Sequence, residues 1–263
     1  MIERYMSNSE YATHFEKLFG LRSRIACELP IKPHMHILDV ATGEGFFAIE
    51  AVRLHGDVKM TGIDISQGVV REARRNIRKQ NLQDFIEILE MDAMDMRFPK
   101  GEFDMVIDFT GLEDVLMTRG YDGVQRTFFE VNRVLKPNGY FCLAEMLPDE
   151  METKAQKIEV AVFSNICSAP RLSGNRYKTL LEKAKFKLIR KGGYYTGLRF
   201  TPQQAQNEIR YVIKRVPKIY GINTPTFEEV WTEFGQDIEK NGLGCYSKVV
   251  LMVAHKVEDI NIK

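Results

Sequence analysis

The sequence lacks the paired cysteines that mark zinc knuckles, redox dithiols and disulfide frameworks. Its four cysteines, Cys27, Cys142, Cys167 and Cys245, lie far apart, and no C-x-x-C pair occurs. Isolated cysteines of this kind are most often buried and reduced. We therefore expect four buried thiols, no disulfide and no metal site.

Long apolar runs and an excess of one charge are also missing. The longest apolar runs, such as the one within 248–255, are far shorter than the roughly 20 residues of a membrane-spanning helix. Lys and Arg number 37 against 36 Asp and Glu, so no overall field favours a nucleic acid or a membrane surface. The N-terminus shows no apolar export signal. These absences predict a cytoplasmic protein with no membrane span and no nucleic-acid partner.

Between residues 34 and 255, short apolar runs alternate with segments of helical period. This alternation predicts one α/β domain, 1–263, in which crossover helices connect the strands of a parallel sheet. Strands are expected near 36–41, 58–63, 85–90, 103–109, 140–146, 186–191 and 248–255. Helices are expected near 45–55, 66–80, 121–136, 151–167 and 177–185.

Two segments do not belong to this alternating pattern: one precedes it, and the other is inserted before its last strand. An amphipathic helix over 10–29 predicts an N-terminal helical lid, 1–30. An insertion at 201–246 contains two expected helices, the first basic and the second acidic, over 203–216 and 226–241. Their opposite charges predict that the two helices pack against each other, within one chain or across a homodimer.

Residues 36–47 read as a hydrophobic strand, an acid, a tight glycine turn and the start of a helix. Gly43 and Gly45 let a ligand approach the backbone at the end of the first strand, where open α/β sheets bind ligands. The same turn fits a dinucleotide fingerprint, G-x-G-x-x-A, with Asp64 about 20 residues on. Asp39 disfavours that alternative, because a carboxylate just before the turn repels a pyrophosphate but suits an amino group. An amino-acid-bearing nucleoside is the favoured ligand.

Residues 39–45, Asp-Val-Ala-Thr-Gly-Glu-Gly, resemble the first motif of the class I S-adenosylmethionine (SAM)-dependent methyltransferases. Ala41 replaces the first glycine of that motif. Residues 62–66 look like the second motif, 90–94 like the third, and 103–108 like the fourth strand. The pattern is closest to the quinone-biosynthesis, small-molecule type. It implies a Rossmann-like, doubly wound seven-stranded sheet, mostly parallel with the last strand antiparallel.

The resemblance also implies roles for individual residues, with SAM as cofactor and S-adenosylhomocysteine (SAH) as product. Asp64 would accept hydrogen bonds from both ribose hydroxyls. Asp92 would bind the adenine amino group, and the Ala93 N–H would meet the ring. Asp108 and Phe109 would lie beside the methionine part. The expected cofactor-binding residues are Asp39, Ala41, Thr42, Gly43, Gly45, Asp64, Ile65, Asp92, Ala93, Asp108 and Phe109.

Methyl transfer from a sulfonium is an in-line displacement, so positioning the acceptor and excluding water supply much of the rate. An acceptor that loses a proton also needs a nearby base. Asp108, Glu113 and Tyr11 are the first candidates for that role. Further candidates are Glu145, Tyr5 and His14, and for each of these residues ordinary packing or surface exposure is the alternative.

Several motifs are absent, which reduces the number of possible classes of methyl acceptor. No Asn-Pro-Pro-Tyr follows the fourth strand, no Pro-Cys nucleophile occurs there, and no Asp and Asn pair follows the fifth strand. We therefore expect neither base-flipping chemistry nor magnesium. The sequence predicts methyl transfer to a small molecule. A protein side chain as acceptor, and a non-catalytic scaffold that keeps the SAM fold, are the alternatives.

Overall fold

The computed structural model describes residue 18 and residues 20–259. Contacts divide the chain into two compact units. Among the described residues, the sheet unit comprises Arg22–Glu145, Asn175–Gly193 and 250–259. The helical unit comprises 18, 20–21, Met146–Gly174 and Tyr194–Val249. The insertion expected at 201–246 lies wholly in the helical unit. The assignment of a single domain to 1–263 stays a prediction.

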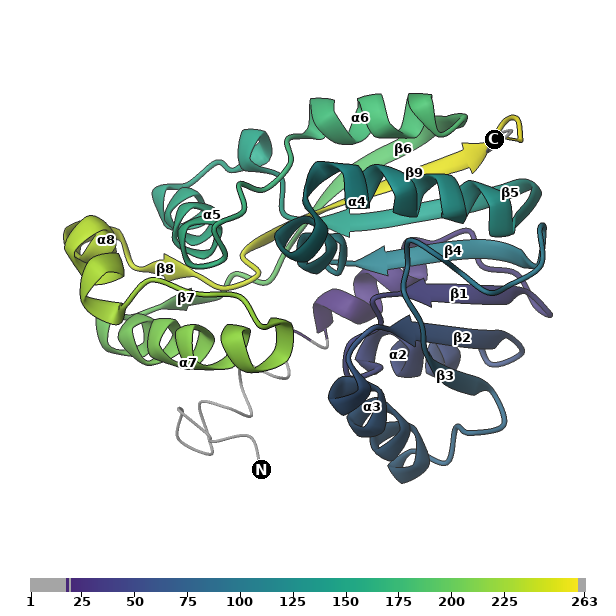
Figure 1. The fold of residues 1–263 in the computed structure, drawn as a ribbon, viewed down its shortest axis with the longest axis horizontal. Coiled ribbons are helices and arrows are strands. Elements are labelled where there is room, and N and C mark those ends of the chain that lie inside the picture. Colours follow the sequence, from purple (N-terminus) through teal and green to yellow (C-terminus); the bar gives the residue numbers. More distant parts are fainter. Residues whose placement is uncertain (1–17, 19, 260–263) are drawn as a thin grey trace. The chain divides into compact units, whose positions relative to one another are not determined.

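The sheet has seven strands in the order β3-β2-β1-β4-β5-β9-β6 (Figure 1). The pairs β1–β2, β2–β3, β1–β4 and β4–β5 are parallel, and β9 runs antiparallel to β5. This arrangement confirms the expected Rossmann-like sheet. The strands are β1 His36–Val40, β2 Lys59–Asp64, β3 Ile86–Glu90, β4 Phe103–Phe109, β5 Leu135–Glu145, β6 Phe186–Tyr195 and β9 Lys248–Lys256.

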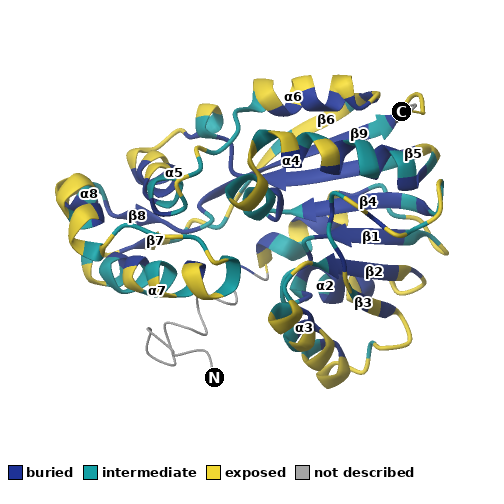
Figure 2. Ribbon diagram, in the orientation of Figure 1, coloured by how far each residue is buried: buried dark blue, intermediate teal, exposed yellow. Residues whose placement is uncertain are grey.

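Helices α2, α3, α4 and α6 belong to the same unit. Figure 2 shows the central strands buried and the outer faces of α3 and α6 exposed. Phe128 of α4 packs edge to face on Phe141 of β5, with ring centroids 5.1 Å apart, so helix and sheet share one aromatic core. The helices are α2 Phe46–His55, α3 Gln67–Lys79, α4 Leu112–Val134 and α6 Gly174–Lys183.

Helix α4 differs from its expected bounds at both ends. It begins at Leu112, and Gly120 (φ 66°, ψ −169°) kinks it, so the expected start at 121 marks only its second segment. The expected end at 136 is wrong because Leu135 already pairs with Phe103 in the sheet. The register shifts between that pair and the next, Met105 with Tyr140. The irregular segment after Leu135 therefore interrupts β5 instead of preceding it.

The helical unit contains α5 Lys154–Ile166, α7 Pro202–Tyr220, α8 Phe227–Asn241 and the short antiparallel strands β7 Arg199–Phe200 and β8 Leu243–Gly244. Thr153, Thr201 and Thr226 form a capping box at the start of each helix. Each box satisfies backbone N–H groups that the first turn leaves unpaired. The three helix starts are therefore defined by local sequence.

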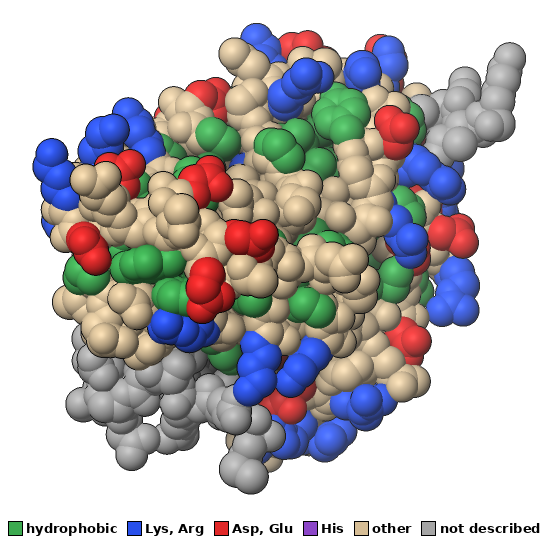
Figure 3. Space-filling model, turned by 60° about the vertical axis from the view of Figure 1, so that its left-hand side comes forward, with side chains coloured by type: hydrophobic (Ala, Val, Ile, Leu, Met, Phe, Trp, Pro, Cys, Tyr) green, Lys and Arg blue, Asp and Glu red, His purple; other side chains and the backbone are tan. Residues whose placement is uncertain are grey.

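Helices α7 and α8 pack against each other as the sequence predicts. The Arg210 guanidinium of α7 lies 3.5 Å from the ring centroid of Phe227 in α8. Ile209 and Val230 are buried in the apolar cluster beneath them. Figure 3, turned toward this part of the chain, shows positive and negative side chains together and only small, separate hydrophobic areas.

Only part of the expected N-terminal helix lies within the described residues. Residues 20–28 are helical, with Ile25 and Ala26 buried. Cys27 is exposed on the outer side of this helix, which corrects the expectation of four buried thiols, whereas Cys142 and Cys245 are buried. Within residues 20–259, no helix is both long and apolar enough to cross a membrane.

Candidate active site

The glycine turn after β1 leaves open space at the edge of the sheet. Gly43 has φ +57°, which favours glycine, and a Cβ added there would meet nothing within 4 Å. The Gly43 N–H donates to Asp64 Oδ2 at 3.1 Å, so the turn is tied to the end of β2. A ligand can therefore lie directly against the turn.

Asp39, near the end of β1, is 1% exposed. The Thr42 hydroxyl donates to its Oδ2 at 2.5 Å. Burial raises the pKa of Asp39 to about 7; Asp108 and Asp64 raise it further, while the Thr42 bond and the Arg22 guanidinium oppose the rise. A cation beside Asp39 would stabilise its ionised form. The position suits an ammonium group and not a phosphate.

Asp64 ends β2, and its carboxylate fixes the loop that follows. Asp64 Oδ1 accepts from the Ser66 N–H at 2.9 Å. Burial raises the pKa of Asp64, whereas the hydrogen bonds from the Ser66 and Gly43 N–H groups lower it, and the rise prevails. Each carboxylate oxygen keeps a second lone pair for a ligand hydroxyl. Ile65 next to it is 51% exposed, unusual for a large apolar side chain, and could cover a ligand ring. Ser66 stands at the start of α3 but makes no side-chain capping bond.

Asp92 and Ala93 follow β3, the edge strand. Asp92 Oδ1 accepts from the Met94 N–H at 2.8 Å, and Asp92 Oδ2 lies 3.9 Å from Arg119 Nη2 of α4. Ala93 is buried. Asp92 is thus held by its own loop and does not contribute to the raised pKa of Asp39.

Asp108 of β4 and Glu145 of β5 form a buried carboxyl pair, each 1% exposed. Their side chains hydrogen-bond to each other, which requires one of them to be protonated. Burial raises the pKa of Asp108 to about 6, and burial together with Asp108 raises the pKa of Glu145 well above its ordinary value. The pair therefore keeps one proton at neutral pH.

The backbone N–H of Gly111, just before α4, donates to Asp108 Oδ1 at 3.2 Å. Asp108 Oδ2 and Glu145 Oε1 have no hydrogen-bond partner among the described residues. The pair therefore has spare acceptor capacity at the edge where the turn lies. A ligand donor or an acceptor proton could use it.

The remaining candidates divide into two groups. Phe109 stacks on Phe47 with ring centroids 5.1 Å apart, and Glu113 is half-buried in the first turn of α4. Tyr5, Tyr11 and His14 lie outside the described residues. The structure thus brings together Asp39, Asp64, Asp108 and Glu145.

Sequence reasoning missed one residue of this edge, Arg22. Its guanidinium carbon lies 5.4 Å from the ring centroid of Phe46 and 5.6 Å from that of Phe109. No sequence motif marks it, because it reaches the glycine turn only through the packing of the helix before β1.

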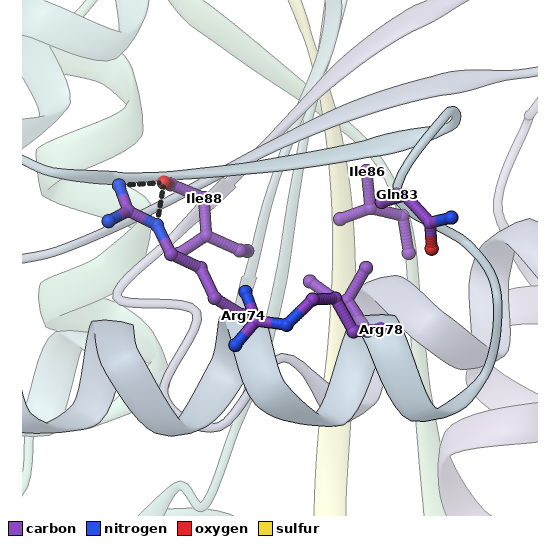
Figure 4. A pocket seen from close by; sticks show the side chains of 6 residues that line it. Arg74, Arg78, Gln83, Ile86 and Ile88 are labelled. Carbon is purple, nitrogen blue, oxygen red and sulfur yellow. Dashed lines mark hydrogen bonds between the residues drawn. The ribbon is translucent and has the colours of Figure 1, made fainter.

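A hollow of about 410 Å³ lies elsewhere, between α3 and β3 (Figure 4). The Arg74 guanidinium donates twice to the Ile88 carbonyl, at 3.0 and 2.7 Å. None of the expected cofactor residues lines this hollow; it is bordered by Arg74, Ile77, Arg78, Gln83, Ile86 and Ile88. We therefore do not assign the candidate site to it.

Comparison with known proteins identifies the family. A family model described as a methyltransferase domain matches residues 31–185, more than half of the chain. A demethylmenaquinone methyltransferase of Symbiobacterium thermophilum is 36% identical over 119 residues, which cover 44% of this chain and 45% of that protein. A sterol 24-C-methyltransferase of Gibberella zeae is 31% identical over 163 residues, which cover 59% of this chain and 41% of that protein. The matched segments thus span less than half the length of these relatives.

A solved geranyl diphosphate C-methyltransferase from Streptomyces coelicolor shares the fold. The match has a TM-score of 0.57 and 16% identity, and it covers 90% of this chain and 79% of that protein's chain. At that identity the likeness speaks for the fold alone. Together with the family match, it confirms the resemblance found in the sequence: the chain belongs to the methyltransferase domain family, within the class I SAM-dependent methyltransferases.

Proposed function

We propose that this chain transfers the methyl group of SAM to a small-molecule acceptor and releases SAH. The observation that carries the proposal is the set of carboxyl groups at the ends of β1, β2 and β4, beside a glycine turn whose Cβ space is open. The family match supports the cofactor. Relatives named for demethylmenaquinone and sterol substrates favour an apolar acceptor.

The residues present fit the cofactor. Asp39 would hold the ammonium group, because its buried carboxylate gains from a neighbouring cation. Asp64 would accept from the ribose hydroxyls, Asp92 and Ala93 would meet the adenine, and Ile65 would cover it. The backbone of Thr42, Gly43 and Gly45 would line the methionine part, with Ala41 and Phe109 at its sides. SAM, when bound, supplies an electrophilic methyl group.

The chain's own chemical work would then be positioning and proton handling. Asp108 is the first candidate to take a proton from the acceptor, since its pKa is raised to about 6 and its Oδ2 has no hydrogen-bond partner among the described residues. Glu145 would tune that pKa through the shared hydrogen bond. Glu113 is the second candidate. A cytoplasmic location and a homodimer stay predictions.

Calorimetric titration with SAM, SAH and NAD tests the cofactor. We expect SAM and SAH to bind and NAD not to bind. Asp64→Ala should weaken SAH binding by about 1–3 kcal/mol, because a carboxylate that takes two ribose bonds is lost. Glu87→Gln, an exposed change on β3, serves as the matched control. Tighter binding of NAD than of SAH would overturn the cofactor assignment.

Incubation with methyl-labelled SAM and a size-fractionated cell extract tests the acceptor. We expect label in small, organic-extractable products. Label confined to macromolecules would instead support the alternative of a protein side chain. Tight SAH binding without any labelled product, in any fraction, would support the non-catalytic alternative.

A further inference from the structure

Arg22 brings a positive charge to the part of the edge where β1 and β4 end, among the carboxyl groups of Asp39 and Asp108. Its guanidinium faces the ring of Phe46, which begins α2 just after the glycine turn, and the ring of Phe109, which ends β4. Aromatic faces hold a planar guanidinium by cation–π attraction and limit its motion. The guanidinium is thus fixed at the carboxyl ends of β1 and β4.

The helix that carries Arg22 is itself anchored within the sheet unit. The Ser23 hydroxyl donates to the Glu50 carboxylate of α2. Ile25 on the same helix is 1% exposed and Ala26 is fully buried. The packing of this helix therefore places the backbone of Arg22 at the edge of the sheet, and the two rings place its guanidinium.

The charge of Arg22 acts on Asp39. Of the side chains that shift the pKa of Asp39, Arg22 is the positive one, whereas Asp108 and Asp64 are negative. A buried acid and a fixed guanidinium thus stand close together at the same turn. Such a pair is complementary to a ligand group that carries both charges.

The amino-acid end of an adenosyl thioether carries an ammonium and a carboxylate on one carbon atom. Asp39 suits the ammonium, but the carboxylate would be repelled by Asp39, Asp64 and Asp108 unless a cation met it. We propose that Arg22 binds this carboxylate while Asp39 binds the ammonium, so that the two residues together select the intact amino-acid end. The inference rests on the proposed function.

Three ligands separate this role from a structural one. SAH carries both charges, its decarboxylated analogue keeps the amine but lacks the carboxylate, and methylthioadenosine lacks both. Calorimetry would compare them on the wild type and on Arg22→Met, which keeps an apolar stem against Phe46 and Phe109. Arg24→Met, an exposed position of the same helix, is the matched control for loss of charge.

We expect Arg22→Met to weaken SAH binding about 10- to 100-fold, the effect of losing hydrogen bonds to a charged group. Binding of the decarboxylated analogue and of methylthioadenosine should change by no more than about 2-fold. Arg22→Lys should lie between, because it keeps the charge but loses the planar fork that matches a carboxylate. Arg24→Met should bind all three ligands like the wild type.

An equal loss for all three ligands would overturn the inference, because it would show that Arg22 only supports the fold. Unchanged SAH binding in Arg22→Met would overturn it as well. The ratio of SAH to methylthioadenosine affinity is measured on one preparation, so a partly unfolded variant does not obscure it. Failure of the folded wild type to bind SAH at all would instead contradict the proposed cofactor.

Discussion

The carboxyl groups of Asp108 and Glu145 hydrogen-bond to each other in a place from which water is excluded. Two neighbouring buried carboxylates cannot both be ionised without large repulsion. The pair therefore retains one proton over a range in which isolated acids have lost theirs. We expect the pH dependence of stability to reflect that proton.

Glu145→Gln should reduce the pH dependence of stability. Folding raises the pKa of both acids, so the folded state holds extra protons above about pH 4, and the free energy of unfolding falls as pH rises through about 6 for Asp108. Glutamine still donates to Asp108 but cannot ionise. Urea unfolding at pH 5 and pH 8 should show a smaller difference in the variant.

Glu145→Ala should behave differently, since it leaves Asp108 buried without its donor. We expect a loss of about 1–3 kcal/mol in the free energy of unfolding at pH 7. Glu87→Gln, exposed on β3, should match the wild type at both pH values. Identical pH dependence in the wild type and Glu145→Gln would show that the pair does not share a proton.

Asp39 should make SAH binding depend on pH. Its pKa is raised to about 7, and the ionised form is the one that attracts an ammonium. SAH affinity should therefore rise about 10-fold between pH 6 and pH 8, as the ionised fraction grows. In Asp39→Asn the affinity should be lower and independent of pH. Calorimetry with methylthioadenosine, which has no ammonium, should give a flat profile in both proteins; a parallel rise would exclude Asp39 as the ammonium ligand.

Gly62→Ala should destabilise the sheet unit. A Cβ at Gly62 would lie 2.6 Å from Ile88 Cδ1 and 2.8 Å from Thr42 Oγ1, so the hydroxyl that donates to Asp39 would have to move. We expect a cost of about 1–3 kcal/mol in urea unfolding, together with weaker SAH binding. Gly68→Ala in α3 is the control, because the added Cβ would lie 3.9 Å from its nearest neighbours, Arg71 Nη2 and Ser66 Oγ, and alanine favours the helix. Equal stability of the two variants would refute the close approach.

Ser247→Ala should weaken the helical unit. The Ser247 hydroxyl and N–H both donate to the buried Glu159 of α5, whose pKa burial raises to about 7 in spite of these bonds. We expect a loss of about 1–2 kcal/mol in the free energy of unfolding. Thr179→Ala, exposed in α6, should cost much less. Hydrogen exchange should be faster in α5 of the variant than elsewhere, which distinguishes a local loss of stability from a global one. Unchanged protection of the α5 amides would contradict the prediction.

The strands and the glycine turn could be predicted from sequence because local patterns specify them. Buried parallel strands are nearly continuous apolar runs, and the acid and glycines around Asp39 and Gly43 stand next to one another in the chain. Strands β7 and β8 could not be found, since two residues are too few for a period. The start of α4 was missed because Gly120 interrupts the pattern.

The contacts that give the site its chemistry are tertiary. Asp108 and Glu145 meet only because β4 and β5 are neighbours in the sheet, with Phe109 opposite Ala144. Their shared proton follows from burial, which the sequence does not reveal. The end of a helix and a loop lie between Arg22 and Asp39 in the chain, so no sequence spacing relates the two residues.

The strand order has a consequence for how the chain assembles. Among the described strands, β6 is hydrogen-bonded only to β9, which is made after the whole 201–246 insertion. During synthesis the backbone groups of β6 remain unpaired until β9, about fifty residues further along the chain, inserts between β5 and β6. Completion of the sheet should therefore be a late event, and the nascent chain should be most prone to aggregation just before β9 leaves the ribosome.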